Sequence, residues 1–566
     1  MIMKFRLKRF LILLVAIACY VPLQAQVLPV GTPLLDDYYR RLQLLGKLDS
    51  TVSFNVRPLT NQVLQQENIY DPEGLQSRDN SIYHSKDGKG MVQLLPVMWQ
   101  NQVNSSFPYG WNDAGMIPAK GYQTMLSAGF YAEYKFLSVQ FRPEFVYAQN
   151  SDFPGYEGSE VTHWSKWYFH ANRIDQPERF GTEAYTRFYP GQSSIRLNFH
   201  PISIGLSTES LWWGPGMKNS LLMSNNAPGF PHLTINTTRP IRTAIGSFEG
   251  QLVGGRLDAS GFPPTTLGRS HYLDTLLYQP KPDDWRYFSG LVLSYQPKWI
   301  PGLSLGLVNV FTVYNEHMGN KLGDYLPFLP SGSTAPDIDW TDPNLEHDQA
   351  AHDVNVSVFA RWVIPEAHFE IYGEFARNDR SYDMRDLIVQ AGHSRSYMFG
   401  LRKMFPVKII EDNEWMQIAF EMTQLEPSKN ADLRPGGPMY GHFIVRDGYT
   451  NRGQVLGAGI GYGNNSQTLN VSWLQGMKQL GVQFERLVHN NALFYELIAD
   501  RRRNWVDYSF GAYGEYDYKN FIFTGKLNLT HARNYQYQIG DSRSLWNFAK
   551  RDRNNLHLQV GMMYRF

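Results

Sequence analysis

The chain has 566 residues, a formal net charge of +1 and one cysteine, and 14% of its residues are aromatic. The near-zero charge argues against nucleic-acid binding, which needs a strongly basic surface. A single cysteine excludes an internal disulfide framework and thiolate metal clusters. No stretch of 18 apolar residues follows the N-terminal region, which excludes helical membrane spans.

Residues 1–25 have the parts of an export signal peptide. A basic start, formed by Lys4, Arg6, Lys8 and Arg9, precedes an apolar stretch that is too short to span a bilayer. Cleavage after Ala25 removes four basic residues and no acidic ones, which leaves a net charge of −3. Residues 16–19 loosely resemble a lipobox, so lipidation of Cys19 stays open as an alternative.

Residues 26–75 are predicted to form a short helical segment on the periplasmic side. Leucines and one tyrosine lie on one helix face, namely Leu34, Leu35, Tyr38, Leu42 and Leu45. Asp36 and Asp37 suit the first turn, and Gly46 stands where a helix ends. Two roles stay open for this segment: a plug or docking element, and a plain cap on the rest of the chain.

From about residue 90 onward, apolar and polar residues alternate with the period of two that is typical of strands. Clear examples are 195–200, 354–359, 369–375 and 521–530. A transmembrane β-barrel turns its apolar side outward, so Glu370, Glu374 and Lys526 would line a wet lumen. A soluble β-sandwich shows the same alternation, and the pattern alone does not separate the two folds.

The last eleven residues favour the barrel. Leu556, Leu558, Val560, Met562, Tyr564 and Phe566 share one face of a strand that runs to the end of the chain. An exposed apolar edge strand invites aggregation, whereas the last strand of a barrel pairs with the first. The sequence therefore predicts an all-β fold, a transmembrane antiparallel β-barrel over residues 76–566, with about 16–20 strands from the chain length.

Two glycine-containing motifs are not assigned a chemical role. Residues 302–306 match the G-x-S-x-G pattern, but Ser304 lies within a run of alternating leucines and is predicted to be a strand residue. Glycines recur at period two at Gly457, Gly459, Gly461 and Gly463. We expect them on one face of a strand, where an internal element approaches closely or the barrel bends.

The stretch 209–231 is the densest candidate site. It joins Trp212 and Trp213 to a polar run that includes Asn225 and Asn226. A sugar ring needs an apolar surface to stack on and polar groups for its hydroxyls, which this stretch offers. The alternative is that the two tryptophans anchor the loop to the barrel or lie in the membrane interface.

A second candidate is a charged block near a strand end. It contains Glu374, Arg377, Asp379, Arg380, Arg385 and Asp386. Facing a lumen, these side chains could bind glycan hydroxyls or uronates. They could equally form an internal network of ion pairs that rigidifies the barrel.

Three blocks together resemble the Wzi-type capsule assembly family. They are 209–231 with 239–241 and 248–251, then 370–379 with 383–386 and 393–397, and finally 447–457. The resemblance implies an outer-membrane barrel of about 18 strands with a small periplasmic helical part, and it adds Arg239 to the candidate site. It also implies a non-enzymatic protein that binds capsular or exopolysaccharide. The short N-terminal helical part departs from the enterobacterial members.

We therefore predict a lectin-like protein of the bacterial outer membrane that assembles or attaches surface polysaccharide. The expected partners are that polysaccharide, outer-membrane lipid and lipopolysaccharide, and the barrel-assembly machinery during insertion. We expect a monomer without nucleic acid, cofactor or metal. The alternatives are a porin or sugar-selective channel and, less favoured, an outer-membrane hydrolase, for which no Ser/His/Asp arrangement is visible.

Overall fold

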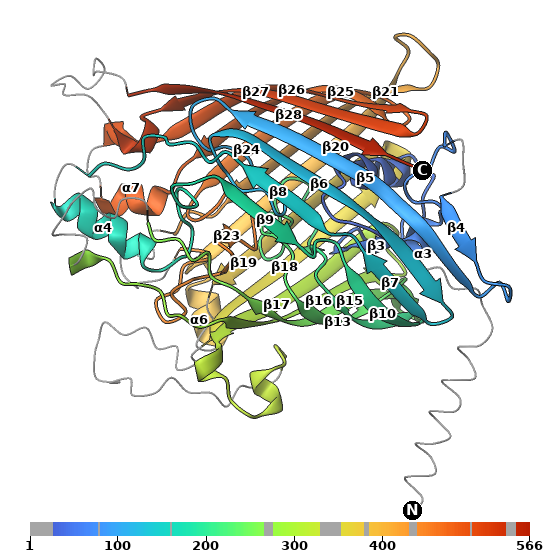
Figure 1. Cartoon of the computed structure of the whole chain (residues 1–566), viewed down its shortest axis with the longest axis horizontal. Coiled ribbons are helices and arrows are strands. Elements are labelled where there is room, and N and C mark those ends of the chain that lie inside the picture. The colour runs from blue at the N-terminus through green and yellow to red at the C-terminus, as the bar shows by residue number, and fades with distance from the viewer. Residues whose placement is uncertain are drawn as a thin grey trace, which may run out of the picture.

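The structure is a computed structural model that describes residues 26–76, 80–158, 161–264, 276–328, 352–378, 384–428, 438–497, 501–538 and 551–566. The predicted signal peptide, residues 1–25, lies outside the described residues. Most of the chain forms one antiparallel sheet that closes on itself (Figure 1).

The sheet contains 22 strands. The first half, in chain order, consists of β4 (Ser81–His84), β5 (Gly90–Asn104), β6 (Gly121–Tyr134), β7 (Leu137–Phe141), β8 (Glu144–Ala148), β9 (Tyr185–Tyr189), β10 (Ser194–Phe199), β11 (Ile202–Ser207), β13 (His232–Thr237), β14 (Ile241–Arg242) and β15 (Gly246–Leu257). The second half consists of β16 (Arg286–Pro297), β17 (Leu303–Tyr314), β18 (Asp353–Ile364), β19 (Phe369–Asn378), β20 (Arg395–Val407), β21 (Glu414–Gln424), β24 (Asn465–Gln475), β25 (Lys478–Val488), β26 (Val506–Tyr518), β27 (Phe521–Arg533) and β28 (Arg553–Tyr564).

The barrel closes between β28 and β5, whose register runs from His557 opposite Asn104 to Tyr564 opposite Val97. The last strand thus pairs with the first long strand, as predicted. Three barrel strands are interrupted, so that β7 with β8, β9 with β10, and β13 with β14 each count as one strand. Strand β4 is not counted, because it only pairs with β5 beyond the end of β28. The result is a closed 18-strand antiparallel barrel. The predicted fold class is confirmed.

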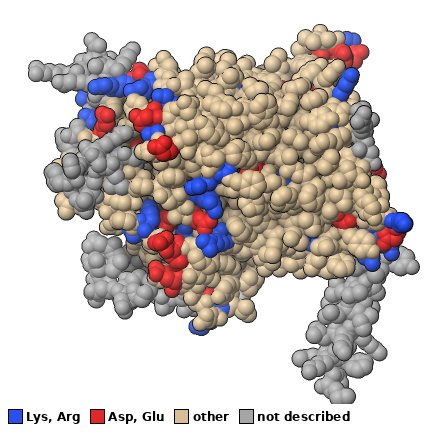
Figure 2. Space-filling view, in the orientation of Figure 1, with Lys and Arg blue, Asp and Glu red and all other residues tan. Residues whose placement is uncertain are grey.

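Side chains alternate between the two faces of the wall, as the period of two requires. On β10, Ile195 is 55% exposed whereas Arg196 is 5% exposed. On β19, Phe375 faces outward while Glu370 and Glu374 are buried inside. Figure 2 shows charged residues gathered toward the two ends, with a broad band between them almost free of charge on this face. An apolar outer band above a polar interior is typical of a barrel that spans a bilayer.

The two ends of the barrel differ in the length of their connections. One end has the short turns 135–136, 200–201, 243–245, 298–302, 365–368, 408–413, 476–477 and 519–520. The opposite end has the long connections 105–120, 149–184, 208–231, 258–285, 315–352, 379–394, 425–464, 489–505 and 534–552. Outer-membrane barrels have short periplasmic turns and long extracellular loops, so the first end is periplasmic and the second extracellular.

The helices among the described residues are few, and none is part of the barrel wall. They are α2 (Pro33–Leu44), α3 (Asn61–Leu64), α4 (Val161–Ala171), α6 (Met384–Val389) and α7 (Asn491–Leu497), with short 3₁₀ turns. The predicted helix with its leucine face is α2. Among the described helices, none is long and apolar enough to cross a bilayer.

The expectation for the four glycines was wrong in part. Residues 456–463 form turns and not a strand, because this segment belongs to an extracellular connection. The expected close approach is present, since a Cβ added to Gly457 would lie 2.2 Å from the carbonyl oxygen of Leu221. Ser304, by contrast, is a strand residue of β17, as predicted.

Candidate functional site

The N-terminal segment lies inside the barrel at its periplasmic end, where one buried carboxylate holds it to the wall. Glu370 of β19 forms ion pairs with three guanidinium groups: Arg40 of α2 at 3.0 Å, Arg361 of β18 at 2.6 Å and Arg402 of β20 at 2.8 Å. Arg402 also pairs with Asp37 of α2 at 2.6 Å. Buried charges are tolerated only when they are paired, so this cluster fixes α2 against β18–β20.

The extracellular connection 208–231 folds into the lumen and meets this N-terminal segment. Its short strand β12 (Trp212–Trp213) pairs with β2 (Val56–Arg57). The Glu421 carboxylate of β21 accepts hydrogen bonds from the backbone N–H groups of Met217, Lys218 and Asn219. Sequence reasoning missed Glu421, because its partners are backbone groups that are distant in the chain.

A second extracellular connection, 425–464, packs on top of the first. The Tyr440 hydroxyl donates to the carbonyl oxygen of Leu221 at 2.7 Å, and the Tyr449 hydroxyl donates to that of Leu222 at 2.7 Å. Within the same connection, β22 (Thr450–Asn451) and β23 (Gln454–Val455) form a small hairpin. The lumen is therefore filled from the periplasmic end by residues 26–75 and from the extracellular end by inward-folded loops.

The two predicted tryptophans lie among the residues that fill the lumen, and their contacts differ. Trp213 is 0% exposed and donates its indole N–H to Gln251 at 2.9 Å. Trp212 is 4% exposed, and the Arg57 guanidinium lies 4.6 Å from its ring centroid. Trp213 has no surface left for a sugar ring, so in this arrangement it anchors the loop. Trp212 borders an internal cavity of the barrel.

Asn225, Asn226 and Glu374 also lie inside the barrel and hold the loop 208–231. Asn225 donates to the carbonyl oxygen of Asn112 at 3.0 Å, and Asn226 donates to that of Val455 at 2.9 Å. Glu374 accepts from the backbone N–H of Leu221 at 3.0 Å. All three are buried, so in this arrangement their polar atoms serve the packing of the loops.

The remaining predicted site residues do not gather with these. Arg377 is buried at the end of β19, whereas Arg385 is exposed on α6 at the extracellular end. Arg239 is exposed at the opposite, periplasmic end of the barrel. Asp379 and Arg380 lie outside the described residues, as does the side chain of Asp386. A glycan-binding role for any of the predicted residues stays a prediction.

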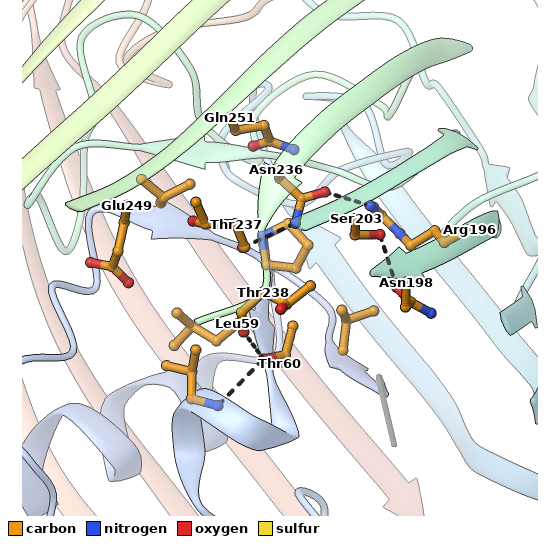
Figure 3. A pocket seen from close by; sticks show the side chains of 14 residues that line it. Leu59, Thr60, Arg196, Asn198, Ser203, Asn236, Thr237, Thr238, Glu249 and Gln251 are labelled. Atoms are coloured by element: carbon orange, nitrogen blue, oxygen red, sulfur yellow. Dashed lines mark hydrogen bonds between the residues drawn. The ribbon is translucent and has the colours of Figure 1, made fainter. Parts of the chain in front are cut away.

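A small cavity of about 30 Å³ marks how closely the N-terminal segment fits the wall (Figure 3). Thr60, which caps α3, donates to the carbonyl oxygen of Thr238, while Arg196 donates to Asn236 on the wall. A water molecule takes up about 30 Å³ of liquid volume, so this space is too small for a sugar.

A larger cavity of about 380 Å³ lies on the other side of the N-terminal segment. Strands β5, β6, β21 and β24–β28 form its outer wall, and its inner boundary includes α2, Trp111, Trp212 and Lys218. Asp36 of α2 borders the cavity, and burial raises the pKa of its carboxyl to about 6. Among the described residues, no group of His, Cys, Asp and Glu side chains is arranged to hold a metal ion.

An aromatic cluster at the extracellular end was missed by the sequence reasoning. Helix α4 packs against α7, with Trp164 and Tyr168 in the core between them. Trp167 is partly exposed, and its ring stacks on that of Tyr156 at 5.7 Å and 11°. Phe169 is 40% exposed beneath the Arg173 guanidinium at 3.7 Å. The run of aromatic residues in 164–169 was the available signal.

Comparisons with known proteins agree with this architecture. The family described as capsule assembly protein Wzi matches residues 104–519. A solved structure of Wzi from Escherichia coli, described as an outer membrane protein involved in group 1 capsule assembly and a carbohydrate-binding β-barrel, has a TM-score of 0.59 at 12% identity. The alignment covers 96% of this chain and 100% of that one. This similarity shows the fold.

Similarities to other solved structures are weaker. OccAB2 of Acinetobacter baumannii has a TM-score of 0.40 at 9% identity, with 83% of this chain and 98% of that chain covered. A BenF-like porin of Pseudomonas fluorescens Pf-5 has a TM-score of 0.32 at 8% identity, covering 86% and 100%. No curated protein sequence matches the chain. The closed antiparallel barrel, together with the family match, places the protein in the outer membrane.

Proposed function

The chain belongs to the capsule assembly protein Wzi family, and on this premise we propose that it binds capsular or exopolysaccharide at the cell surface and helps to assemble or attach it. The observation that carries the proposal is the filled lumen beneath a single loop-rich end. The described part of such a barrel offers a fixed surface toward the exterior above a largely filled lumen. The Escherichia coli Wzi barrel, described as carbohydrate-binding and involved in capsule assembly, supports the same role.

The contact surface that we propose for the polymer is the aromatic cluster around α4. Apolar faces of sugar rings stack on aromatic side chains, while their hydroxyls bind nearby polar groups. Trp167 and Phe169 supply partly exposed rings, and Arg173 supplies a cation beside them. Each such contact is weak, but a repeating polymer offers many copies, so that attachment rests on avidity.

A channel is the main alternative, and it makes a different prediction. A porin needs a continuous aqueous path, which the described N-terminal segment and the loops 208–231 and 425–464 occupy. We therefore expect the full-length barrel in a planar bilayer to give no stable single-channel conductance steps. Regular open-channel steps would favour the channel over the attachment role.

We also propose a non-enzymatic, monomeric protein in contact with lipid and lipopolysaccharide, inserted by the barrel-assembly machinery. The outward apolar band suits lipid contact. Closure of the wall leaves little exposed strand edge through which a second copy would pair.

Deletion of the gene tests the proposal in cells. We expect the deletion strain to make polysaccharide but release most of it into the medium, and the wild-type gene to restore surface retention. A Trp167→Ala/Phe169→Ala gene should restore retention poorly. Trp299→Ala is the matched control, since Trp299 is 67% exposed on a periplasmic turn. Unchanged retention in the deletion strain would contradict the proposal.

A further inference from the structure

The internal cavity of about 380 Å³ has the size of a ligand site, because small-molecule sites occupy about 300–1,000 Å³. The N-terminal segment and the loops 105–120 and 208–231 border it. A Cβ added to Gly31 of the N-terminal segment would lie 2.2 Å from the side-chain nitrogen of Asn225, so the segment and the loop 208–231 touch. The backbone N–H of Ala114 also donates to the carbonyl oxygen of Asn225 at 2.9 Å.

The outer wall of the cavity is rich in carboxamides. Six of them come from five strands: Gln100, Gln417, Asn470, Gln479, Gln483 and Gln559. A carboxamide both donates and accepts hydrogen bonds, as does a sugar hydroxyl. Trp111 is half-buried at the boundary, with one side against Tyr109 at 5.2 Å between ring centroids. It supplies the flat apolar surface that the C–H face of a sugar ring prefers.

Charged groups border the cavity without pairing with one another. Lys218 and Lys526 repel each other electrostatically, and within the described part of the chain neither forms an ion pair. Within the described residues, the Lys218 ammonium donates only to the Gln483 side chain, at 3.2 Å. Asp36 and Glu515 border the same space, and no described side chain pairs with their carboxylates. Enclosed charges need hydroxyl or water partners, and sugar hydroxyls are able to replace water there.

We propose that this cavity binds the terminal one or two sugar rings of a glycan chain, through hydroxyl contacts to its carboxamides and charged side chains. A polymer cannot pass through, because the N-terminal segment and the inward loops occupy the rest of the lumen. Only a chain end therefore enters. The inference rests on the proposed function and assigns to it a second, internal site that differs from the aromatic surface around α4.

The test uses purified full-length barrel in detergent and isothermal titration calorimetry. The probes are intact surface polysaccharide of the host and fragments of two, four and eight sugar residues prepared from it by partial hydrolysis. Capture of chain ends predicts one fragment bound per barrel, with an affinity that changes less than about threefold from two to eight residues. Affinity that rises steadily with fragment length would contradict an end-binding site.

Ala419→Phe places a ring at the buried cavity wall, and we expect it to weaken binding of the two-residue fragment at least tenfold. Ala512→Phe, on the exposed outer face of β26, is the matched control and should leave binding unchanged. Heat-modifiable migration on gels checks folding. Should Ala419→Phe not fold, Lys526→Met takes its place, with Lys478→Met as control and an expected loss of at least fivefold.

The outcomes separate the two proposals. Binding of polymer without binding of any short fragment, or fragment binding that neither cavity variant weakens, overturns the cavity site and leaves the proposed function standing. Failure of both polymer and fragments to bind overturns the proposed function itself. Fragment binding that is lost in the cavity variants and kept in both controls supports the internal site.

Discussion

The two halves of the lumen wall carry similar polar side chains but face different surroundings. Strands β15–β20 contact the N-terminal segment directly, and several of their buried charges have partners there, as Glu370 has in Arg40 and Glu249 has in the backbone N–H of Ser53. Strands β24–β28, with β5 and β6, face the cavity, where Lys526 and Glu515 have no ion-pair partner among the described residues. Inward polarity thus serves packing on one side, and on the other side it supports the proposed internal site.

Glu370→Gln, on the packed side, should have the largest effect on the free energy of unfolding. The substitution leaves three buried guanidinium groups without their shared counter-charge, which we expect to cost about 3–5 kcal/mol of unfolding free energy. Guanidinium chloride titrations of the barrel in detergent, followed by tryptophan fluorescence, measure it. Glu366→Gln, on an exposed periplasmic turn, should change stability by less than about 0.5 kcal/mol. Equal effects would contradict the anchoring role.

Trp213→Phe should have the next largest effect. It leaves the Gln251 carboxamide without its indole donor in a fully buried position, at a cost of about 1–3 kcal/mol. The same titration measures it, with Trp362→Phe on the outer face as control, since Trp362 is 43% exposed. If Trp213→Phe keeps full stability but loses glycan binding, the indole contacts sugar and not the loop packing.

On the cavity side, Asp36 should affect the pH dependence of stability. Burial raises the pKa of Asp36 from 3.8 to about 6, so the folded state binds its proton more tightly than the unfolded state. This contribution favours folding at low pH and is lost as the pH rises from about 4 to about 6, by about 1–3 kcal/mol. Asp36→Asn should lose less stability across that window than wild type, while Asp412→Asn, whose side chain is 83% exposed, should match wild type. Identical slopes in all three would mean that the cavity solvates Asp36 fully.

The smallest effect is expected for Arg239→Ala. Arg239 is exposed in the interruption 238–240 between β13 and β14, at the periplasmic end and far along the barrel from the extracellular loops. We expect stability to change by less than about 0.5 kcal/mol, and polysaccharide affinity to stay at the wild-type value in calorimetry. A clear loss of affinity would place a glycan contact at the periplasmic end.

More of the fold than of the site could be predicted from the sequence. Apolar and polar residues alternate along 195–200 and 369–375, and the last strand has an apolar face. Together these patterns were enough to predict a barrel, because a period of two decides which side chains face lipid. The site was harder, because aromatic and amide residues look alike in sequence whether they pack or bind. Trp213 proved to be buried against the barrel wall and Asn226 between loops, and Glu421 binds backbone groups that no motif reveals. Such contacts depend on which loop enters the lumen, and this is a property of the folded chain.

The most direct test of the account is saturable binding of the purified, detergent-solubilised barrel to surface polysaccharide of its host. We expect wild-type protein to bind, Trp167→Ala/Phe169→Ala to bind at least tenfold more weakly, and Trp299→Ala to bind as wild type does. Heat-modifiable migration establishes that all three are folded. Folded wild-type barrel that binds no polysaccharide of its host would contradict the central claim.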